Sequence, residues 1–160
     1  MNITICIATY KRPNSLKRLL LSLANLCFKK DPSPEWYVIV VDNDAECSAY
    51  NIIEEIRSSF PVTIKYAVEP TKGIASARNK AVKLAGGADF VAFIDDDEVA
   101  EPNWLDELLF VQSQYNADVV QGPVLPKFEQ EPPNWITRGD FFSRPRHKTG
   151  TNLKYSSTNN

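Results

Sequence analysis

Residues 90–97 read Phe-Val-Ala-Phe-Ile-Asp-Asp-Asp, five apolar residues followed by three adjacent carboxylates. A short, continuous apolar run is typical of a strand that is buried on both faces of a parallel sheet. Because the acids begin where the run ends, we expect them at the carboxyl end of that strand. Ligands of open α/β sheets bind just outside these strand ends. The stretch therefore predicts a fold class and the edge of the sheet where the chemistry lies.

The rest of the chain alternates between strand-like and helix-like patterns on both sides of this stretch. The expected strands are 3–8, 36–41, 62–68, 90–94 and 118–124, and apolar residues recur at helical spacing over 16–26, 49–60, 73–84 and 102–115. Strands that alternate with helices predict an α/β fold, with a mostly parallel sheet and helices on both faces.

Composition excludes several classes of protein. Of the 160 residues, 43% are hydrophobic and 24% are charged, which is typical of a globular domain and not of a disordered or fibrous chain. The net charge of −2 argues against a nucleic-acid partner. No apolar run reaches the roughly 20 residues of a membrane span, and the first residues lack the pattern of a secretory signal. Cys6, Cys27 and Cys47 form neither a metal motif nor a disulfide framework. We therefore expect a reduced, cytoplasmic protein.

The charge changes sign near residue 125. Residues 126–160 hold six Lys or Arg against three acids, together with four of the eleven prolines. We therefore predict a packed domain over 1–125, followed by a Pro-rich, basic extension over 126–160.

Three adjacent carboxylates repel one another in a medium of reduced dielectric, so they need a counter-charge. Mg²⁺ and Mn²⁺ prefer oxygen ligands, and Mg²⁺ is usually held by one or two carboxylates together with substrate phosphates. In an extended segment Asp95 and Asp97 point to the same side and Asp96 points elsewhere. The alternative is a solvated acidic turn without a ligand.

Basic residues supply the other half of a phosphate site. Lys72 and Gly73 precede a predicted helix, whose N-terminus favours anions, and Arg78 lies one turn into it. The alternative is ordinary surface charge at a helix start. The glycine-rich loops of dinucleotide-binding folds and of P-loop proteins are both absent from the sequence. A nucleotide diphosphate held by a metal ion and carboxylates remains.

Four segments in order carry a resemblance to a known family. They are 7–13 (Ile-Ala-Thr-Tyr-Lys-Arg-Pro), 40–44 (Val-Val-Asp-Asn-Asp), 72–79 (Lys-Gly-Ile-Ala-Ser-Ala-Arg-Asn) and 93–97 (Phe-Ile-Asp-Asp-Asp). Together they resemble the family-2 glycosyltransferases, which have the GT-A fold, over about residues 1–125. That family transfers a sugar from a nucleotide-diphosphate donor to an acceptor hydroxyl, usually with inversion. The resemblance implies a UDP-linked donor, a glycan or lipid-linked acceptor and a role in cell-envelope or surface polysaccharide synthesis.

The resemblance also implies roles for individual residues. The donor-binding residues would be Ala8, Thr9, Tyr10, Arg12, Asp42, Lys72, Gly73, Arg78, Asp95 and Asp96, and the metal ligands would be Asp95 and Asp97. The first three would line the base, and Asp42 would accept a hydrogen bond from the base or the ribose. Lys72, Gly73 and Arg78 would lie along the nucleotide and its diphosphate, and the metal would be Mn²⁺ or Mg²⁺.

The catalytic base of an inverting transfer is not identified. In the resembling family it lies well downstream of the Asp-x-Asp motif, often in a Glu-Asp pair, and the only acids beyond Asp118 are Glu129, Glu131 and Asp140. We expect this chain to be the donor-binding part of a longer enzyme, with 126–160 as the start of a truncated acceptor region. The alternatives are a non-catalytic nucleotide-sugar-binding module and a nucleotidyltransferase.

The basic extension has two possible roles. Arg138, Arg144, Arg146 and Lys148 lie among Trp135, Phe141 and Phe142, a mixture that suits peripheral contact with an anionic membrane at its inner face. The alternative is a solvated loop, in which His147 is a solvated residue and not a catalyst.

Overall fold

The computed structural model describes residues 1–30, 34–128, 130–139, 141–142 and 146–152. The chain divides into two compact units, Met1–Asp106 and Glu107–Asn160. This division lies at a different place from the boundary that we predict at residue 125, which rests on the change in charge and proline content. The boundary at residue 125 stays a prediction. Of the predicted features, Glu129, Asp140 and Arg144 lie outside the described residues.

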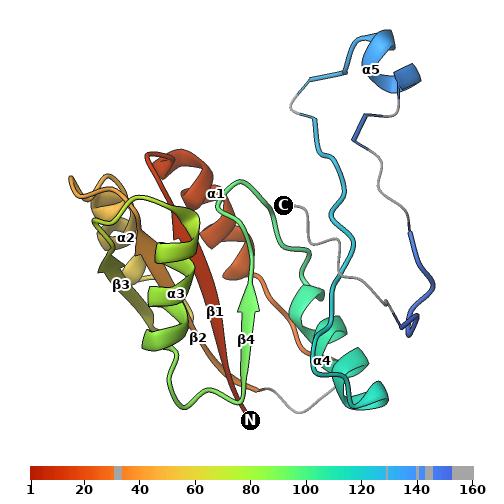
Figure 1. Ribbon diagram of the computed structural model, residues 1–160, viewed down its shortest axis with the longest axis horizontal. Helices are drawn as coiled ribbons and strands as arrows, with labels where there is room; N and C mark the ends of the chain where they lie inside the picture. The colour runs from red at the N-terminus through yellow and green to blue at the C-terminus, as the bar shows by residue number, and fades with distance from the viewer. Residues whose placement is uncertain (31–33, 129, 140, 143–145, 153–160) are drawn as a thin grey trace. The chain divides into compact units, whose positions relative to one another are not determined.

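The first unit is built on a parallel sheet with the strand order β3-β2-β1-β4 (Figure 1). The strands are β1 (Asn2–Thr9), β2 (Glu35–Asp42), β3 (Ile64–Val68) and β4 (Phe90–Phe93). β1 pairs with β2 along its whole length and with β4 over a shorter stretch, so β1 lies inside the sheet. The predicted α/β class and the parallel sheet are confirmed.

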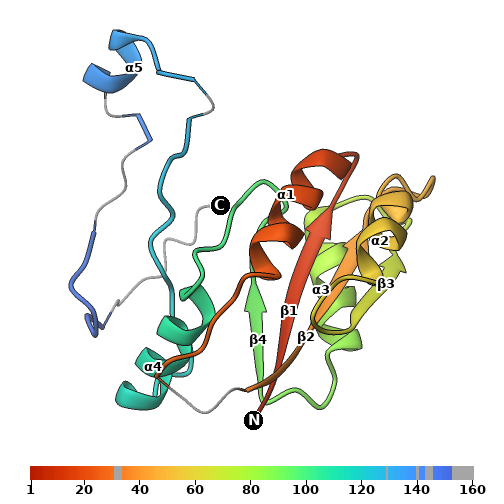
Figure 2. The ribbon, with the colours of Figure 1, turned by 180° about the vertical axis from the view of Figure 1, so that it is seen from behind.

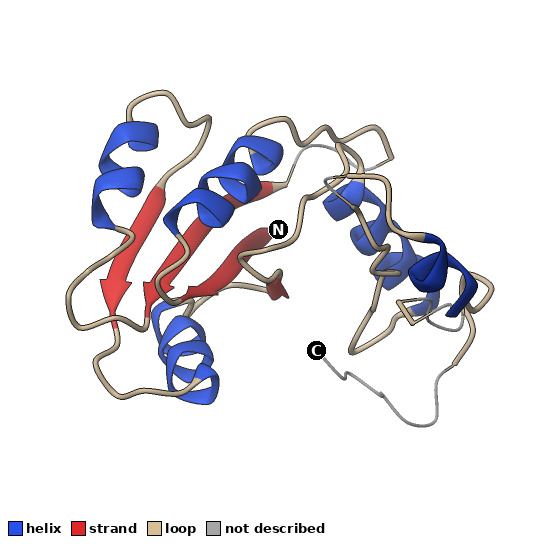
Figure 3. Cartoon of the chain, turned by 90° about the horizontal axis from the view of Figure 1, so that it is seen from above, coloured by secondary structure: helices blue, strands red, loops and turns tan. Residues whose placement is uncertain are grey.

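Helices cover both faces of the sheet, as predicted (Figure 3). α3 (Ile74–Leu84) lies on one face, and α1 (Pro13–Leu23) and α2 (Tyr50–Arg57) lie on the other (Figure 2). Under α3, the small side chains of Ala77 and Ala81 pack against Cys6, Ile39 and Val41 of the sheet. Small residues on α3 let the helix lie close to the strands, which positions its N-terminus at the sheet edge.

The predicted fifth strand is wrong, because residues 118–124 contain no strand. The segment has an apolar pattern, but Pro123 lacks a backbone N–H group, and glycine at 122 weakens a strand. Val119 is 81% exposed, so the apolar pattern does not mark burial there.

The second unit begins within α4 (Trp104–Tyr115) and contains one short helix that we did not predict, α5 (Asn134–Gly139). In the described part of the chain, no helix has the length and apolar character needed to cross a membrane.

Candidate functional site

The carboxyl ends of the strands surround a cavity of about 390 Å³ in the first unit. Its walls come from the end of β1, the end of β2, the segment between β3 and α3, and the turn after β4; the lining residues are Ala8, Thr9, Tyr10, Arg12, Asn43, Lys72, Gly73, Ile74, Ala77 and Asp96. This is the sheet edge that the sequence predicts for ligand binding.

Seven of the predicted site residues line this cavity: Ala8, Thr9, Tyr10, Arg12, Lys72, Gly73 and Asp96. Arg78, Asp95 and Asp97 are not among the lining residues, but they belong to a network of ion pairs that includes Arg12 and Asp96. Asp42 is neither a lining residue nor a member of this network, although Thr9, its register partner in β1, and Asn43, its neighbour in the chain, both line the cavity.

Asp96 joins the end of β1 to the turn after β4. Its Oδ2 accepts a hydrogen bond from the Thr9 hydroxyl at 2.8 Å, and its Oδ1 lies 3.3 Å from the Arg12 guanidinium. Asp96 is 6% exposed, and burial raises the pKa of its carboxyl, although Thr9 and Arg12 act in the opposite direction. These two partners hold the middle aspartate of the three in the wall of the cavity.

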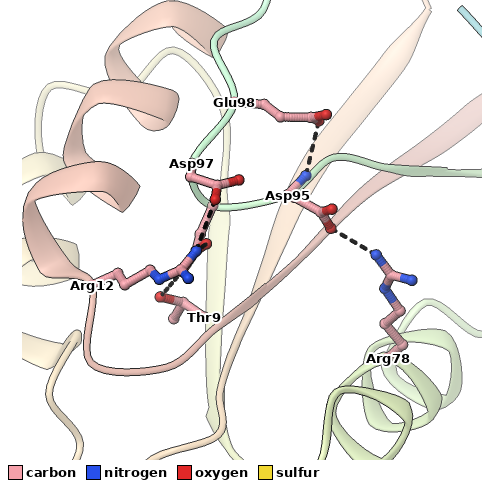
Figure 4. A network of polar contacts seen from close by, with 7 residues as sticks. Thr9, Arg12, Arg78, Asp95, Asp97 and Glu98 are labelled. Atoms are coloured by element: carbon pink, nitrogen blue, oxygen red, sulfur yellow. Dashed lines mark hydrogen bonds and ion pairs between the residues drawn. The ribbon is translucent and has the colours of Figure 1, made fainter. Parts of the chain in front are cut away.

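Asp95 and Asp97 lie against different arginines (Figure 4). Arg12 binds Asp97 at 2.8 Å, and Arg78 of α3 binds Asp95 at 2.6 Å. Asp97 thus shares Arg12 with Asp96, whereas Asp95 contacts Arg78, so our expectation that Asp95 and Asp97 point to the same side and Asp96 points elsewhere is wrong. The chain turns after β4, where the Glu98 N–H donates to the Asp95 carbonyl, so the alternation of an extended strand does not continue through the aspartates.

Asp42 is fully buried at the end of β2. Its carboxylate accepts hydrogen bonds from the N–H groups of Asp44 and Ala49 and from the Tyr66 hydroxyl, at 2.8–3.0 Å. Burial, together with the hydrogen bond to the Asp42 carboxylate and its charge, raises the pKa of Tyr66, which keeps its hydroxyl protonated as the donor. Asp42 thus joins the end of β2 to the segment before α2 and to Tyr66 of β3.

Three lining residues are absent from our predicted site: Asn43, Ile74 and Ala77. Ile74 and Ala77 fit the apolar pattern of α3, and nothing in that pattern separates cavity lining from core. Asn43 lies inside a quoted motif, but its partners are 26–30 residues away, so sequence position alone does not reveal its role.

This edge of the sheet carries groups that attract an anion and groups that attract a cation, which suits an anionic ligand accompanied by a metal ion. Gly73 precedes α3 with φ +132°, a conformation that side-chain-bearing residues rarely adopt, and the free N–H groups of the first helical turn favour anions. Lys72 and Arg12 add positive charge, and the carboxylates of Asp95 and Asp97 are oxygen donors. Within the described residues, no cluster of three or more His, Cys, Asp or Glu side chains is placed to hold a metal ion.

The family model described as glycosyl transferase family 2 matches residues 4–160. The chain belongs to glycosyl transferase family 2. This match confirms the family resemblance that we infer from the segments 7–13, 40–44, 72–79 and 93–97. The chain is therefore a homologue of glycosyltransferases.

Two curated relatives show how much of such a protein this chain represents. It is 38% identical to the succinoglycan biosynthesis protein ExoM of Rhizobium meliloti, over 89% of this chain and 45% of that protein. It is 24% identical to the glucosyl-dolichyl phosphate glucuronosyltransferase of Haloferax volcanii, over 97% of this chain and 52% of that protein. The chain therefore spans about half the length of these relatives.

Solved structures of the same fold class include enzymes with a bound nucleotide or nucleotide sugar. The structure of Staphylococcus aureus TarS residues 1–349 with UDP matches at a TM-score of 0.63 and 26% identity, over 79% of this chain and 38% of that one. A mannosyltransferase from Pyrobaculum calidifontis, solved with GDP-Man and Mn²⁺, matches at a TM-score of 0.58 and 18% identity, over 67% of this chain and 31% of that one. The second likeness shows the fold alone. These neighbours confirm the predicted GT-A architecture.

Proposed function

We propose that the chain binds a nucleotide-diphosphate sugar, most simply a UDP-sugar, and contributes to a metal-assisted, inverting transfer of that sugar to an acceptor hydroxyl. The observation that carries the proposal is the cavity at the carboxyl edge of the sheet, with Arg12 and Lys72 in its walls and the three aspartates beside it.

The walls of the cavity suit the two ends of such a donor. Ala8, Thr9 and Tyr10 offer an apolar surface and a half-exposed ring on the β1 side, which we assign to the base. Lys72 and Gly73, at the start of α3, and Arg78 are assigned to the nucleotide and its diphosphate. A guanidinium group binds phosphate oxygens in a two-pronged geometry that an ammonium group lacks. Arg78 is already at this edge of the sheet, where it pairs with Asp95 at 2.6 Å.

The residues fit a divalent metal ion that completes its ligand set from the donor. Asp95 and Asp97 supply hard oxygen ligands, and Mg²⁺ is commonly held by one or two protein carboxylates together with phosphates and water. Both carboxylates are reachable, with side chains 26% and 56% exposed, and each is now neutralised by an arginine. A bound metal would offset the charge that grows on the leaving diphosphate.

The relatives support a polysaccharide or lipid-linked acceptor. ExoM acts in succinoglycan biosynthesis, and TarS has been solved with UDP and with UDP-GlcNAc. The Haloferax relative acts on a glucosyl-dolichyl phosphate, as its name states. We propose that this chain serves cell-envelope or surface polysaccharide synthesis, with an acceptor of the glycan or lipid-linked class.

The first test is a calorimetric titration of the chain with UDP, with and without Mn²⁺. We expect Mn²⁺ to tighten UDP binding by ~10-fold or more, because Asp95 and Asp97 would hold the cation and its charge would attract the diphosphate. The double variant Asp95→Ala with Asp97→Ala should bind UDP with the same affinity whether or not Mn²⁺ is present.

Asp89→Ala is the matched control, because Asp89 precedes the opposite end of β4, where its carboxylate accepts from the Asn2 N–H. This variant should keep the full Mn²⁺ effect. A folded, unaltered chain that binds no UDP with Mn²⁺ present would contradict the proposal.

The second unit supports a further part of the proposal, contact with the inner face of an anionic membrane. Trp135, Phe141 and Phe142 are more than half exposed, and Trp135 and Phe141 lie with ring centroids 6.2 Å apart. Aromatic rings suit the interface of a bilayer, and Arg138 and Arg146 add positive charge to the same unit. Such contact would bring a lipid-linked acceptor to the enzyme.

A further inference from the structure

Asn43 occupies the residue position that directly follows β2, and its side chain spans the gap to the segment between β3 and α3. Its Nδ2 donates to the carbonyl oxygens of Glu69 and Thr71, both at 2.8 Å. Its Oδ1 accepts from the Gly73 N–H at 2.8 Å. These three contacts hold the backbone on both sides of Lys72.

The donors and acceptor of the Asn43 side-chain amide match the three backbone groups around it. An asparagine side chain has two N–H donors and one carbonyl acceptor, and here two carbonyls and one N–H group face it. Rotating the amide by half a turn would place its oxygen against two carbonyl oxygens, so only one orientation satisfies all three partners. Both donors are used inside the protein, which leaves Asn43 none for a ligand.

The backbone of the same residue is tied to the opposite wall. The Asn43 N–H donates to the Thr9 carbonyl at 2.8 Å, and the Glu69 N–H donates to the Asp42 carbonyl at 2.8 Å. Asn43 therefore connects the β1 wall of the cavity to the wall formed by Lys72 and Gly73. Asn43 itself is 8% exposed, so its hydrogen bonds are sheltered from water.

We propose that Asn43 is a positioning residue for the donor site, which holds the segment 69–73 so that Lys72 and the start of α3 face the nucleotide diphosphate. The proposal rests on the function proposed above, and it concerns the shape of that site and not a direct contact with the donor. An unanchored segment would have to be ordered when the donor binds, and that ordering lowers affinity.

The test compares Asn43→Ala, Asn43→Asp and the unaltered chain by amide hydrogen exchange without ligand and by titration with UDP and Mn²⁺. Asn43→Ala should speed exchange of the Gly73 amide and weaken UDP binding by ~10-fold. Asn43→Asp keeps an acceptor for the Gly73 N–H but places a carboxylate oxygen, which has no donor, against the Glu69 and Thr71 carbonyls, so this variant should also weaken UDP binding. If Asn43 had only a general structural role, Asn43→Ala would lower the melting temperature, but the faster amide exchange would not be confined to residues 69–73.

Asn25→Ala is the matched control, because the Asn25 side chain donates to the Leu21 carbonyl at the end of α1, and the contact is exposed. It should leave both exchange at 69–73 and UDP affinity unchanged. If the unaltered chain binds UDP and Asn43→Ala, still folded, binds it equally well, the inference is overturned and the proposed function stands. If the unaltered chain binds no UDP, the proposed function fails, and the inference fails with it.

Discussion

The aspartates after β4 illustrate how single residues acquire their roles in this chain. The charges of Asp95, Asp96 and Asp97 demand compensation, and in the structure two arginines supply it. Arg12 lies directly before α1, and Arg78 lies within α3, so the compensating charges come from distant parts of the sequence. A counter-charge can therefore be predicted from the triplet alone, but not whether a metal ion or an arginine provides it.

The cysteines give a prediction at the same scale. Burial raises the pKa of the Cys6 thiol to about 12, and the side chain is 1% exposed, whereas Cys27 and Cys47 are half-buried. Because the thiolate is the reactive form, a raised pKa leaves Cys6 protonated and inert near neutral pH. We expect iodoacetamide to label Cys27 and Cys47 in the folded chain and Cys6 only in denaturant, as read by peptide mass spectrometry. Labelling of Cys6 at an equal rate in the folded chain would contradict its burial.

At the scale of elements, helical spacing of leucines predicts α1 and the face that it buries. Leu16, Leu19, Leu20 and Leu23 are fully buried, and the neighbouring Leu21 is 50% exposed. The same reasoning fails for residues 118–124, because an apolar run reports a tendency to be buried and does not supply a neighbouring strand to pair with.

Leu20 and Leu21 test which face of α1 is buried, because they are the same residue type on the same helix and differ in exposure. Leu20→Ala should lower the free energy of unfolding by about 2–5 kcal/mol, because it removes buried methyl groups and leaves a cavity. Leu21→Ala should change it by less than about 0.5 kcal/mol, as expected for a surface position. Urea unfolding followed by circular dichroism measures both, and equal losses would show that the assigned helix face is wrong.

At the scale of the whole molecule, the chain consists of a first unit with the proposed donor site and a second unit that is rich in exposed aromatic and basic residues. It spans about half the length of the two relatives described above. We propose that the part of such an enzyme that this chain supplies is the cavity at the carboxyl edge of the sheet.

Vesicle flotation tests the proposed membrane contact. We expect the chain to float with vesicles that contain phosphatidylglycerol at low salt, and not with pure phosphatidylcholine vesicles, since the basic side chains need anionic headgroups. The variant Trp135→Ser with Arg138→Ser should float less, by several-fold, while Leu21→Ser, which exchanges an exposed apolar residue of α1, should float like the unaltered chain. The absence of flotation at low salt would rule out this part of the proposal.

The α/β class, the helices α1 and α3 and the strand ends at which polar residues gather all follow from local sequence patterns. Periodicity and strand-ending residues are local properties, so they can be read without knowing the fold. The folded chain alone reveals the order of the strands, the contacts of Arg12 with Asp96 and Asp97 across 84–85 positions, and the hydrogen bonds of Asn43 to the segment before α3. These contacts join residues far apart in the chain, and their geometry depends on how the strands pack side by side, which no local pattern encodes.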